Sequence, residues 1–200
     1  MTDVLHWSPL PTTRALIFDC DGTLADTMPV HHRAWEAMLA EHAMVFPEAQ
    51  FYAFAGMPTV GIIRRLAEEQ GVTIADHQLA EMTIDKERRY VDLIGEVSAI
   101  AEVHAIAERY RGELPMAVAS GGERWVVTQT LQAIGILEWM DVLVCSEDTE
   151  RHKPEPDVFL EAARRLGIEP AACTVFEDSD LGLEAGRRAG MQSIDIRPWR

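Results

Sequence analysis

Two aspartates that stand two positions apart, directly after a short apolar run, are the strongest chemical signal in the chain. The run Ala15 to Phe18 is typical of a buried strand, and the acidic pentapeptide Asp19 to Thr23 follows it at once. Ligands of α/β proteins bind beyond the carboxyl ends of parallel strands, so Asp19 and Asp21 stand where a site is expected. Gly22 would let the backbone approach a bound group closely. The competing interpretation is a solvated acidic turn.

Two further candidates occupy similar places later in the chain. Ser120 ends the apolar run Met116 to Ala119, and its hydroxyl, together with the exposed N–H groups of Gly121 and its neighbour, suits a phosphate. The same Ser-Gly-Gly is also an ordinary turn. Lys153 stands in a segment that two prolines stiffen, and a helix is predicted to begin at about Asp157. A lone lysine is usually a solvated surface charge. The argument that Lys153 belongs to a site rests on its position, which agrees with that of the other motifs at the ends of predicted strands.

A second acidic pair, Glu177 and Asp178, follows the apolar run Thr174 to Phe176. If the strand ends meet, four acidic groups face one another with Lys153 as the positive group beside them. Such a cluster repels itself unless a cation is bound. Oxygen ligands without nitrogen or sulfur favour Mg²⁺.

The remaining pattern predicts the elements that must position these residues. Apolar runs typical of buried strands alternate with helical patterns of ten or more residues, which indicates an α/β fold with a parallel sheet and helices on both faces. The predicted strands are 15–18, 116–119, 142–145, 174–176 and 193–196, and the predicted helices are 99–111, 123–134, 157–166 and 181–189.

About 80 residues after the first strand break this alternation, because they carry helical periodicity and no convincing strand. We expect an inserted helical domain over residues 29–94, packed on a core formed by residues 1–28 and 95–200. Three amphipathic helices are predicted in it, the second of which ends at Gly71. Hinges are expected in the two segments that connect the insert to the core, near Thr27 and near residues 95–98.

The composition excludes several classes of protein. The chain has 18 Lys and Arg against 33 Asp and Glu, a formal net charge of −15, which repels nucleic acid and anionic membranes. No apolar run approaches a membrane span and no signal-peptide pattern is present, so we expect a cytoplasmic protein. Cys20, Cys145 and Cys173 form no CxxC pair and are predicted to be buried, reduced thiols. We expect a monomer or a weak dimer.

Taken together, these motifs resemble those of the haloacid dehalogenase superfamily, in order and across the whole chain. The helical insert after the first motif is similar to the cap of that family. The β-phosphoglucomutase-like subgroup, in particular bacterial sugar phosphatases that act on fructose 1-phosphate and related esters, is resembled by three stretches: Asp26-Thr27, His31-x-Arg33-Ala34-Trp35 and Lys153-Pro154-x-Pro156-Asp157. The resemblance implies a Rossmann-like core with an inserted α-helical cap. It also implies a Mg²⁺-dependent phosphatase that acts on a small phosphate ester.

The resemblance assigns a role to each motif. Asp19 would attack phosphorus and also bind Mg²⁺, while Asp21 would protonate the leaving oxygen and ligate the metal through its backbone carbonyl. Asp178 would bind Mg²⁺ directly and Glu177 through water. The residues implied to hold the phosphoryl group are Gly22, Thr23, Ser120, Gly121 and Lys153.

The first predicted cap helix carries two candidates for contact with the rest of the substrate. His31 and Trp35 lie four positions apart, on one face of this helix beside a hinge, so both could project toward a sugar. Trp35 also belongs to the apolar stripe, so packing is an equally good interpretation.

Two alternatives to a phosphatase remain open. A true phosphomutase of the subgroup grips a second phosphate with an arginine from a cap loop, after a Gly-containing turn, whereas this chain has neutral Thr59 after Gly56-Met57-Pro58. Lys86 could compensate in part, although a solvated helix face is the expectation for it. The other alternative is a catalytically inactive sugar-phosphate sensor on the same fold.

Overall fold

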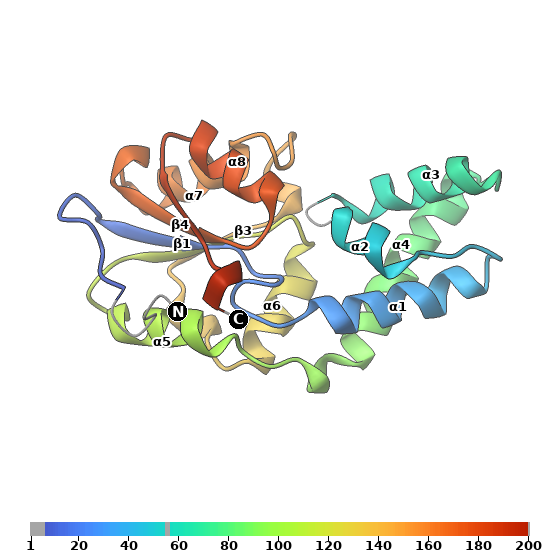
Figure 1. Cartoon of the computed structure of the whole chain (residues 1–200), viewed down its shortest axis with the longest axis horizontal. Helices are drawn as coiled ribbons and strands as arrows, with labels where there is room; N and C mark the ends of the chain where they lie inside the picture. The colour runs from blue at the N-terminus through green and yellow to red at the C-terminus, as the bar shows by residue number, and fades with distance from the viewer. Residues whose placement is uncertain (1–6, 55–56, 200) are drawn as a thin grey trace.

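A five-stranded parallel sheet forms the centre of the larger body of the protein (Figure 1). The computed structural model describes residues 7–54 and 57–199. The strand order is β3-β2-β1-β4-β5, and every neighbouring pair is parallel. The strands are β1 (Ala15–Phe18), β2 (Met116–Ala119), β3 (Val142–Val144), β4 (Cys173–Glu177) and β5 (Gln192–Asp195).

Helices cover both faces of this sheet, because successive residues of a strand point to opposite sides. Leu16 and Phe18 of β1 face one apolar layer, and Ala15 and Ile17 face the other. Figure 1 shows the two layers on opposite sides of the sheet. The first layer holds α5 (Ala101–Tyr110) and α6 (Arg124–Ala133), and the second holds α7 (Asp157–Leu166) and α8 (Asp180–Arg188). The predicted Rossmann-like α/β fold is confirmed.

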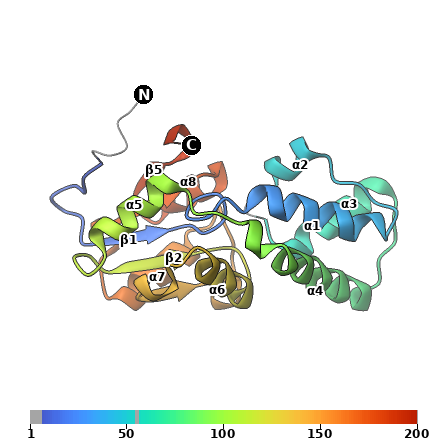
Figure 2. The ribbon, with the colours of Figure 1, turned by 90° about the horizontal axis from the view of Figure 1, so that it is seen from below.

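In the described part of the chain between β1 and α5, four helices lie to one side of the sheet, and we call them the helical insert (Figures 1 and 2). They are α1 (Met28–Ala40), α2 (Glu48–Ala53), α3 (Thr59–Gln70) and α4 (Asp76–Asp92). Helix α3 ends at Gly71, which has a φ of 68°, as the sequence predicts. The expectation of three helices was wrong by one, because α2 has only 6 residues and shows no helical period.

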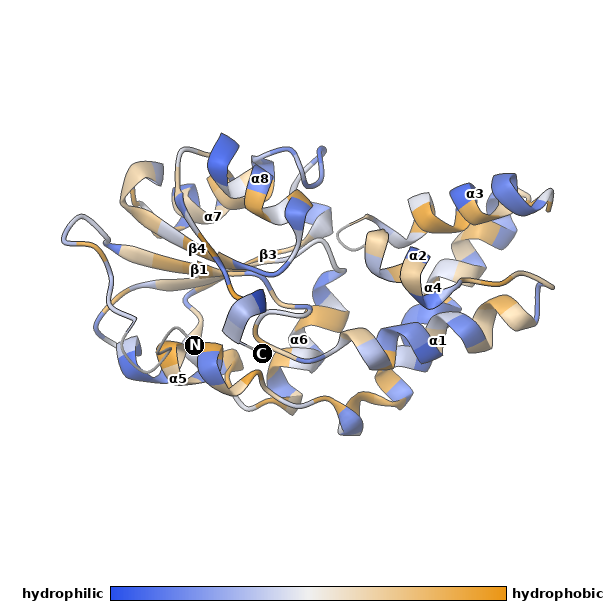
Figure 3. Cartoon of the chain, in the orientation of Figure 1, coloured by the Kyte–Doolittle hydropathy of each residue, from blue (hydrophilic) through white to orange (hydrophobic). Residues whose placement is uncertain are grey.

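The helical insert has an apolar cluster of its own. Trp35, Met38, Phe46, Ile63 and Leu66 are buried in it, and the other members of the cluster come from the insert's helices and the segments that connect them. Figure 3 shows α1, α3 and α4 with alternating hydrophobic and hydrophilic stretches, as amphipathic helices require.

The two segments that join the insert to the sheet run side by side. Ala25 and Ala99 form an isolated antiparallel bridge, and the backbone N–H of Asp26 donates to the carbonyl of Ser98 at 2.8 Å. The two connecting segments are therefore hydrogen-bonded to each other at the edge of the site. Short 3₁₀ turns complete the fold at 94–96, 137–139, 146–148, 170–172 and 197–199.

The three cysteines are free and buried, as expected. No helix in residues 7–54 and 57–199 is long and apolar enough to cross a membrane. Gly56, which belongs to the loop before Thr59 on which the mutase alternative depends, lies outside the described residues.

Candidate active site

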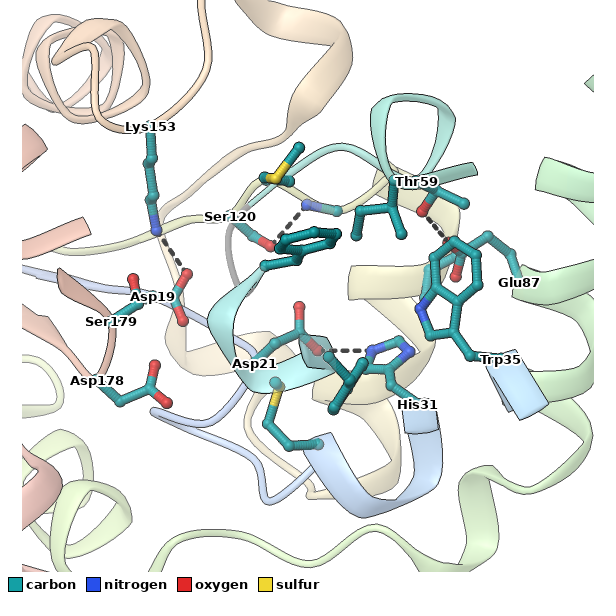
Figure 4. Close-up of a pocket in the computed structure, with 18 of the residues that line it drawn as sticks. Asp19, Asp21, His31, Trp35, Thr59, Glu87, Ser120, Lys153, Asp178 and Ser179 are labelled. Atoms are coloured by element: carbon teal, nitrogen blue, oxygen red, sulfur yellow. Dashed lines mark hydrogen bonds and ion pairs between the residues drawn. The ribbon is translucent and has the colours of Figure 1, made fainter. Parts of the chain in front are cut away.

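The carboxyl ends of three adjacent strands bring together residues that are far apart in the sequence (Figure 4). Asp19 follows β1, Ser120 follows β2 and Glu177 ends β4, with β1 between the other two. All three side chains are buried, and all three line one pocket that opens between the sheet and the helical insert. The sequence-based expectation that these motifs share one site therefore agrees with the geometry.

Lys153 bridges two carboxylates at the bottom of this pocket. Its Nζ atom lies 2.7 Å from Asp19 Oδ1 and 2.7 Å from Glu177 Oε1. Burial alone would lower the pKa of Lys153, but the charges of Asp19 and Glu177 outweigh it and raise this pKa. The lysine is thus a fixed cation beside Asp19.

Three carboxylates form an acidic cluster next to this lysine. Asp19, Glu177 and Asp178 each offer an oxygen, and these oxygens all lie within 4.8 Å of one another. Burial raises the pKa of Asp19, the neighbouring carboxylates Glu177 and Asp178 raise it further, and Lys153 offsets only part of this. A second cation would hold the whole cluster ionised, and an all-oxygen donor set fits a hard divalent ion.

Gly22 leaves room for the Asp178 carboxylate, and Thr23 donates a hydrogen bond to it. Gly22 has a φ of 80°, and a Cβ atom at this position would overlap the carboxylate of Asp178. The hydroxyl of Thr23 donates to Asp178 Oδ1 at 3.3 Å. Both residues therefore act on the acidic cluster in this structure, and neither is among the residues that line the pocket.

Two residues that sequence reasoning missed fix Glu177. The backbone N–H and the hydroxyl of Ser179 both donate to Glu177 Oε2, at 2.6 and 3.0 Å. The hydroxyl of Ser179 also accepts from the N–H of Gly182 and so caps α8. A Cβ atom at Gly182 would overlap the Glu177 carboxylate. The sequence signal that could have revealed these two residues is the Ser-x-x-Gly spacing directly after Glu177 and Asp178.

Ser120 lines the same pocket as Asp178. Its buried hydroxyl accepts from the N–H of Gly122 at 3.0 Å, and Gly121 also lines the pocket. The three residues form a tight turn before α6, in which a hydroxyl and backbone N–H groups lie beside the acidic centre. This is the donor arrangement that suits an anion.

Asp21 faces the helical insert rather than the acidic cluster (Figure 4). Its Oδ1 atom lies 3.1 Å from Nε2 of His31, and Nδ1 of His31 lies 2.9 Å from Nζ of Lys86. A lysine ammonium only donates, so Nδ1 accepts and the imidazole proton is on Nε2, from which it is donated to Asp21. Burial and the charge of Lys86 lower the pKa of His31, in keeping with this neutral tautomer.

The charge state of Asp21 follows from the same contact. Burial opposes its ionisation, but the hydrogen bond from His31 and the nearby charge of Lys86 outweigh this effect and lower the pKa of Asp21 to about 2. In this arrangement Asp21 is a carboxylate, ready to accept a proton. His31, the candidate for substrate contact, touches the Asp21 carboxylate directly.

The expectation for Lys86 was wrong. This lysine is not on a solvated helix face but only 4% exposed, and it lines the pocket. The reason is visible in the spacing of α4, whose buried stripe is Leu79, Met82, Thr83, Lys86, Glu87 and Tyr90. Lys86 and Glu87 stand at positions of that stripe, so the periodicity itself could have placed both residues inside.

Glu87 is a further pocket residue that sequence reasoning missed. Its two oxygens accept from Lys86 at 3.0 and 3.1 Å, and Oε1 also accepts from the hydroxyl of Thr59 at 2.9 Å. Thr59, the neutral residue singled out in the sequence, therefore faces the pocket and holds Glu87.

Apolar side chains form the rest of the insert's side of the pocket. Trp35 is 2% exposed, packs edge-on against Phe46 and lines the pocket, so its packing role and its place in the site coexist. Nζ of Lys86 lies 5.4 Å from the Trp35 ring centroid. The other apolar lining residues from the insert are Met28, Phe51, Phe54, Met57 and Ile62.

The fold and the site together define an α/β enzyme whose acidic, lysine-containing centre lies at the ends of parallel strands, under a helical insert. Residues 16–196 match the family described as haloacid dehalogenase-like hydrolase, and the chain belongs to this family.

Similar proteins agree with this assignment. The fructose-1-phosphate phosphatase YqaB of Escherichia coli is 35% identical over 91% of this chain and 95% of its own length. The 6-phosphogluconate phosphatase of the same organism is 30% identical over 89% of this chain and 80% of its own. A β-phosphoglucomutase from Clostridium difficile has the same fold, with a TM-score of 0.83, 22% identity and coverage of 92% and 84%. The protein is a phosphoric monoester hydrolase of this haloacid dehalogenase-like family.

Proposed function

We propose that the protein is a Mg²⁺-dependent phosphatase that hydrolyses small sugar phosphates, such as fructose 1-phosphate, through an aspartyl-phosphate intermediate. The observation that carries this proposal is the position of Asp19. One of its oxygens is held by Lys153 at 2.7 Å, and Asp21, two residues further on, faces the pocket from the other side.

The first half of the reaction transfers the phosphoryl group to the protein. An oxygen of Asp19 attacks phosphorus as the bond between phosphorus and the sugar oxygen breaks. The sugar oxygen takes a proton from Asp21 as it leaves. The negative charge of a bound phosphate near Asp21 favours the protonated form that this step requires. Lys153, the Ser120 hydroxyl and the N–H groups of the following turn hold the phosphoryl oxygens as charge develops on them.

The second half returns Asp19 to its starting state. Asp21, now a carboxylate, accepts a proton from a water molecule, whose oxygen attacks phosphorus as the bond to Asp19 breaks. Inorganic phosphate leaves. His31 holds the Asp21 carboxylate through its Nε2 proton and so orients the base toward the water.

The acidic cluster fits the implied metal. Asp19 and Asp178 would bind Mg²⁺ through their carboxylates, Asp21 through its backbone carbonyl and Glu177 through water. When bound, Mg²⁺ neutralises charge on the phosphoryl oxygens.

We propose that residues 29–94 act as a cap domain over a core of residues 1–28 and 95–200. The cap would close by bending at the two connecting segments, near Thr27 and residues 95–98. In the closed state it would exclude bulk water from the aspartyl phosphate until the sugar leaves. The contact between His31 and Asp21 is the closed-state link between the two parts. His31 and Trp35 would then border the sugar.

The same pocket favours a phosphatase over a phosphomutase. A mutase must bind a second phosphate in the cap, which requires an available positive group. Thr59 is neutral, and Lys86 is paired with Glu87 at 3.0 Å. Hydrolysis needs no second phosphate site.

Phosphate release from a panel of sugar monophosphates, measured with Mg²⁺ and with EDTA, tests the proposal. We expect metal-dependent release from at least one hexose or pentose phosphate. Conversion of β-glucose 1-phosphate to glucose 6-phosphate with a bisphosphate primer, without release, would instead indicate a mutase. Release that EDTA leaves unchanged would contradict the metal requirement.

A further inference from the structure

The end of the pocket that the helical insert forms contains one balanced pair of charges. Among the described residues that line it from the insert, Lys86 is the cation and Glu87 the anion, and His31 is neutral in the tautomer that Lys86 imposes. The remaining lining residues of the insert are apolar, apart from the Thr59 hydroxyl. A substrate bound by its phosphate at Asp19 places its other end here.

The ammonium group of Lys86 is engaged by other residues of the helical insert in this arrangement. Its Nζ atom lies 2.9 Å from Nδ1 of His31 and 3.0 and 3.1 Å from the two Glu87 oxygens. The carboxylate also cancels the charge of Lys86 at contact distance, where electrostatic interactions in a buried site are strongest.

Glu87 keeps the capacity to accept a hydroxyl. The hydrogen bonds to Glu87 in the described structure use two acceptor positions on Oε1, from Thr59 and Lys86, and one on Oε2, from Lys86. A carboxylate offers about four such positions, so Oε2 can accept one more. Glu87 is 6% exposed and held from both sides, so its orientation is fixed before substrate arrives.

We propose that Glu87 is the specificity-determining residue of this pocket: it selects phosphate monoesters whose far end is uncharged and hydroxylated, and rejects those that end in a carboxylate or a second phosphate. The inference rests on the proposed phosphatase function. A hydroxyl donates to Oε2, and the C–H face of the polyol lies against the wall formed by Trp35, Phe51 and Phe54. An anionic end meets the Glu87 charge without a free cation to offset it.

A matched pair of open-chain substrates tests the proposal. Sorbitol 6-phosphate and 6-phosphogluconate differ at the far end by CH₂OH against a carboxylate. For the wild-type protein we expect kcat/KM to be higher for the polyol, by about tenfold or more. In Glu87→Gln the freed charge of Lys86 attracts the acid, so the polyol-to-acid ratio should fall by about tenfold.

Glu81→Gln is the matched control, because Glu81 lies on the same helix, is exposed and loses the same charge. We expect its ratio to equal that of the wild type. A wild-type preference for the acid, or an unchanged ratio in a folded Glu87→Gln protein, would overturn the inference.

Other outcomes separate the specificity claim from the proposed function. If Glu87→Gln fails to fold, the wild-type ratio decides the proposal by itself, since a ratio near one or below contradicts it. If Glu87 served only to hold α3 to α4, Glu87→Gln would lower the melting temperature and change both substrates equally, which also contradicts the inference. Absence of phosphate release by the wild type from every ester would instead refute the phosphatase function.

Discussion

Lys86 Nζ lies 2.9 Å from Nδ1 of His31, a contact that joins α4 to α1 and fixes which nitrogen of the imidazole carries the proton. The other nitrogen reaches Asp21 at 3.1 Å. The helical insert therefore contacts Asp21, the proposed acid–base residue of the sheet side, through one oriented histidine. Any movement of the insert away from the sheet would break this contact.

His31→Asn tests that link. The shorter side chain cannot donate to Asp21 and accept from Lys86 together, so Asp21 loses its orientation. We expect kcat to fall about 10- to 100-fold while KM changes less than about threefold. Steady-state kinetics with the best sugar phosphate give this split. His32→Asn is the control, since His32 contacts the carbonyl of Phe46 instead. Equal effects of both substitutions would argue against an orienting role.

Gly182→Ala tests the support of Glu177. The added methyl group would overlap the carboxylate, so Glu177 must move and its contact with Lys153 must change. We expect a loss of about 1–3 kcal/mol in the free energy of unfolding, with reduced phosphatase activity. Urea unfolding measures the first effect.

Gly61→Ala provides the comparison for this substitution. Gly61 lies in α3, and the nearest atom to its added Cβ is Met57 Cε at 3.9 Å. We expect unchanged or slightly higher stability there, by about 0.5–1 kcal/mol. A Gly182→Ala protein as stable as Gly61→Ala would show that the Glu177 pocket is not tightly packed.

Mg²⁺ should stabilise the protein through the acidic cluster. At a concentration about 100 times its dissociation constant, a ligand that binds only the folded state adds about 2.7 kcal/mol, equivalent to about 5–10 °C in melting temperature for a chain of this size. Asp178→Asn should abolish the shift, and Asp180→Asn, on the exposed start of α8, should retain it. Differential scanning fluorimetry compares the three proteins. A full shift in Asp178→Asn would place the ion elsewhere.

The cysteines should be unreactive in the folded state. Burial raises the pKa of Cys145 to about 12 and that of Cys173 to about 11, so both remain neutral thiols at pH 8, and Cys20 is fully buried. Titration with Ellman's reagent should detect less than about one thiol before unfolding and all three in denaturant. Rapid reaction of the native protein would contradict the packing of β1, β3 and β4.

Much of the core was predictable because buried parallel strands are nearly continuous apolar runs. Each predicted strand lies within one residue of its observed bounds, and the residues at the carboxyl ends of β1, β2 and β4 meet as the topology requires. The juxtaposition of Asp19, Ser120 and Glu177 was therefore a consequence of the strand order.

The side of the site that the helical insert forms was harder to predict for two physical reasons. The helix Glu48–Ala53 is too short to show a period. Lys86 is buried because α1 and α4 pack together and supply His31, 55 residues away, as its partner. A charged residue without a visible partner is expected at the surface, and the partner here becomes visible only in the folded chain.

The most direct test of the account is the rate of phosphate release from fructose 1-phosphate by Asp19→Asn, measured with Mg²⁺ beside the wild type. The amide cannot form the phosphoryl bond, so we expect a loss of at least about 1000-fold, with the circular dichroism spectrum of the folded wild type retained. Metal-dependent turnover within about tenfold of the wild-type rate would show that Asp19 is not the nucleophile and would contradict the mechanism.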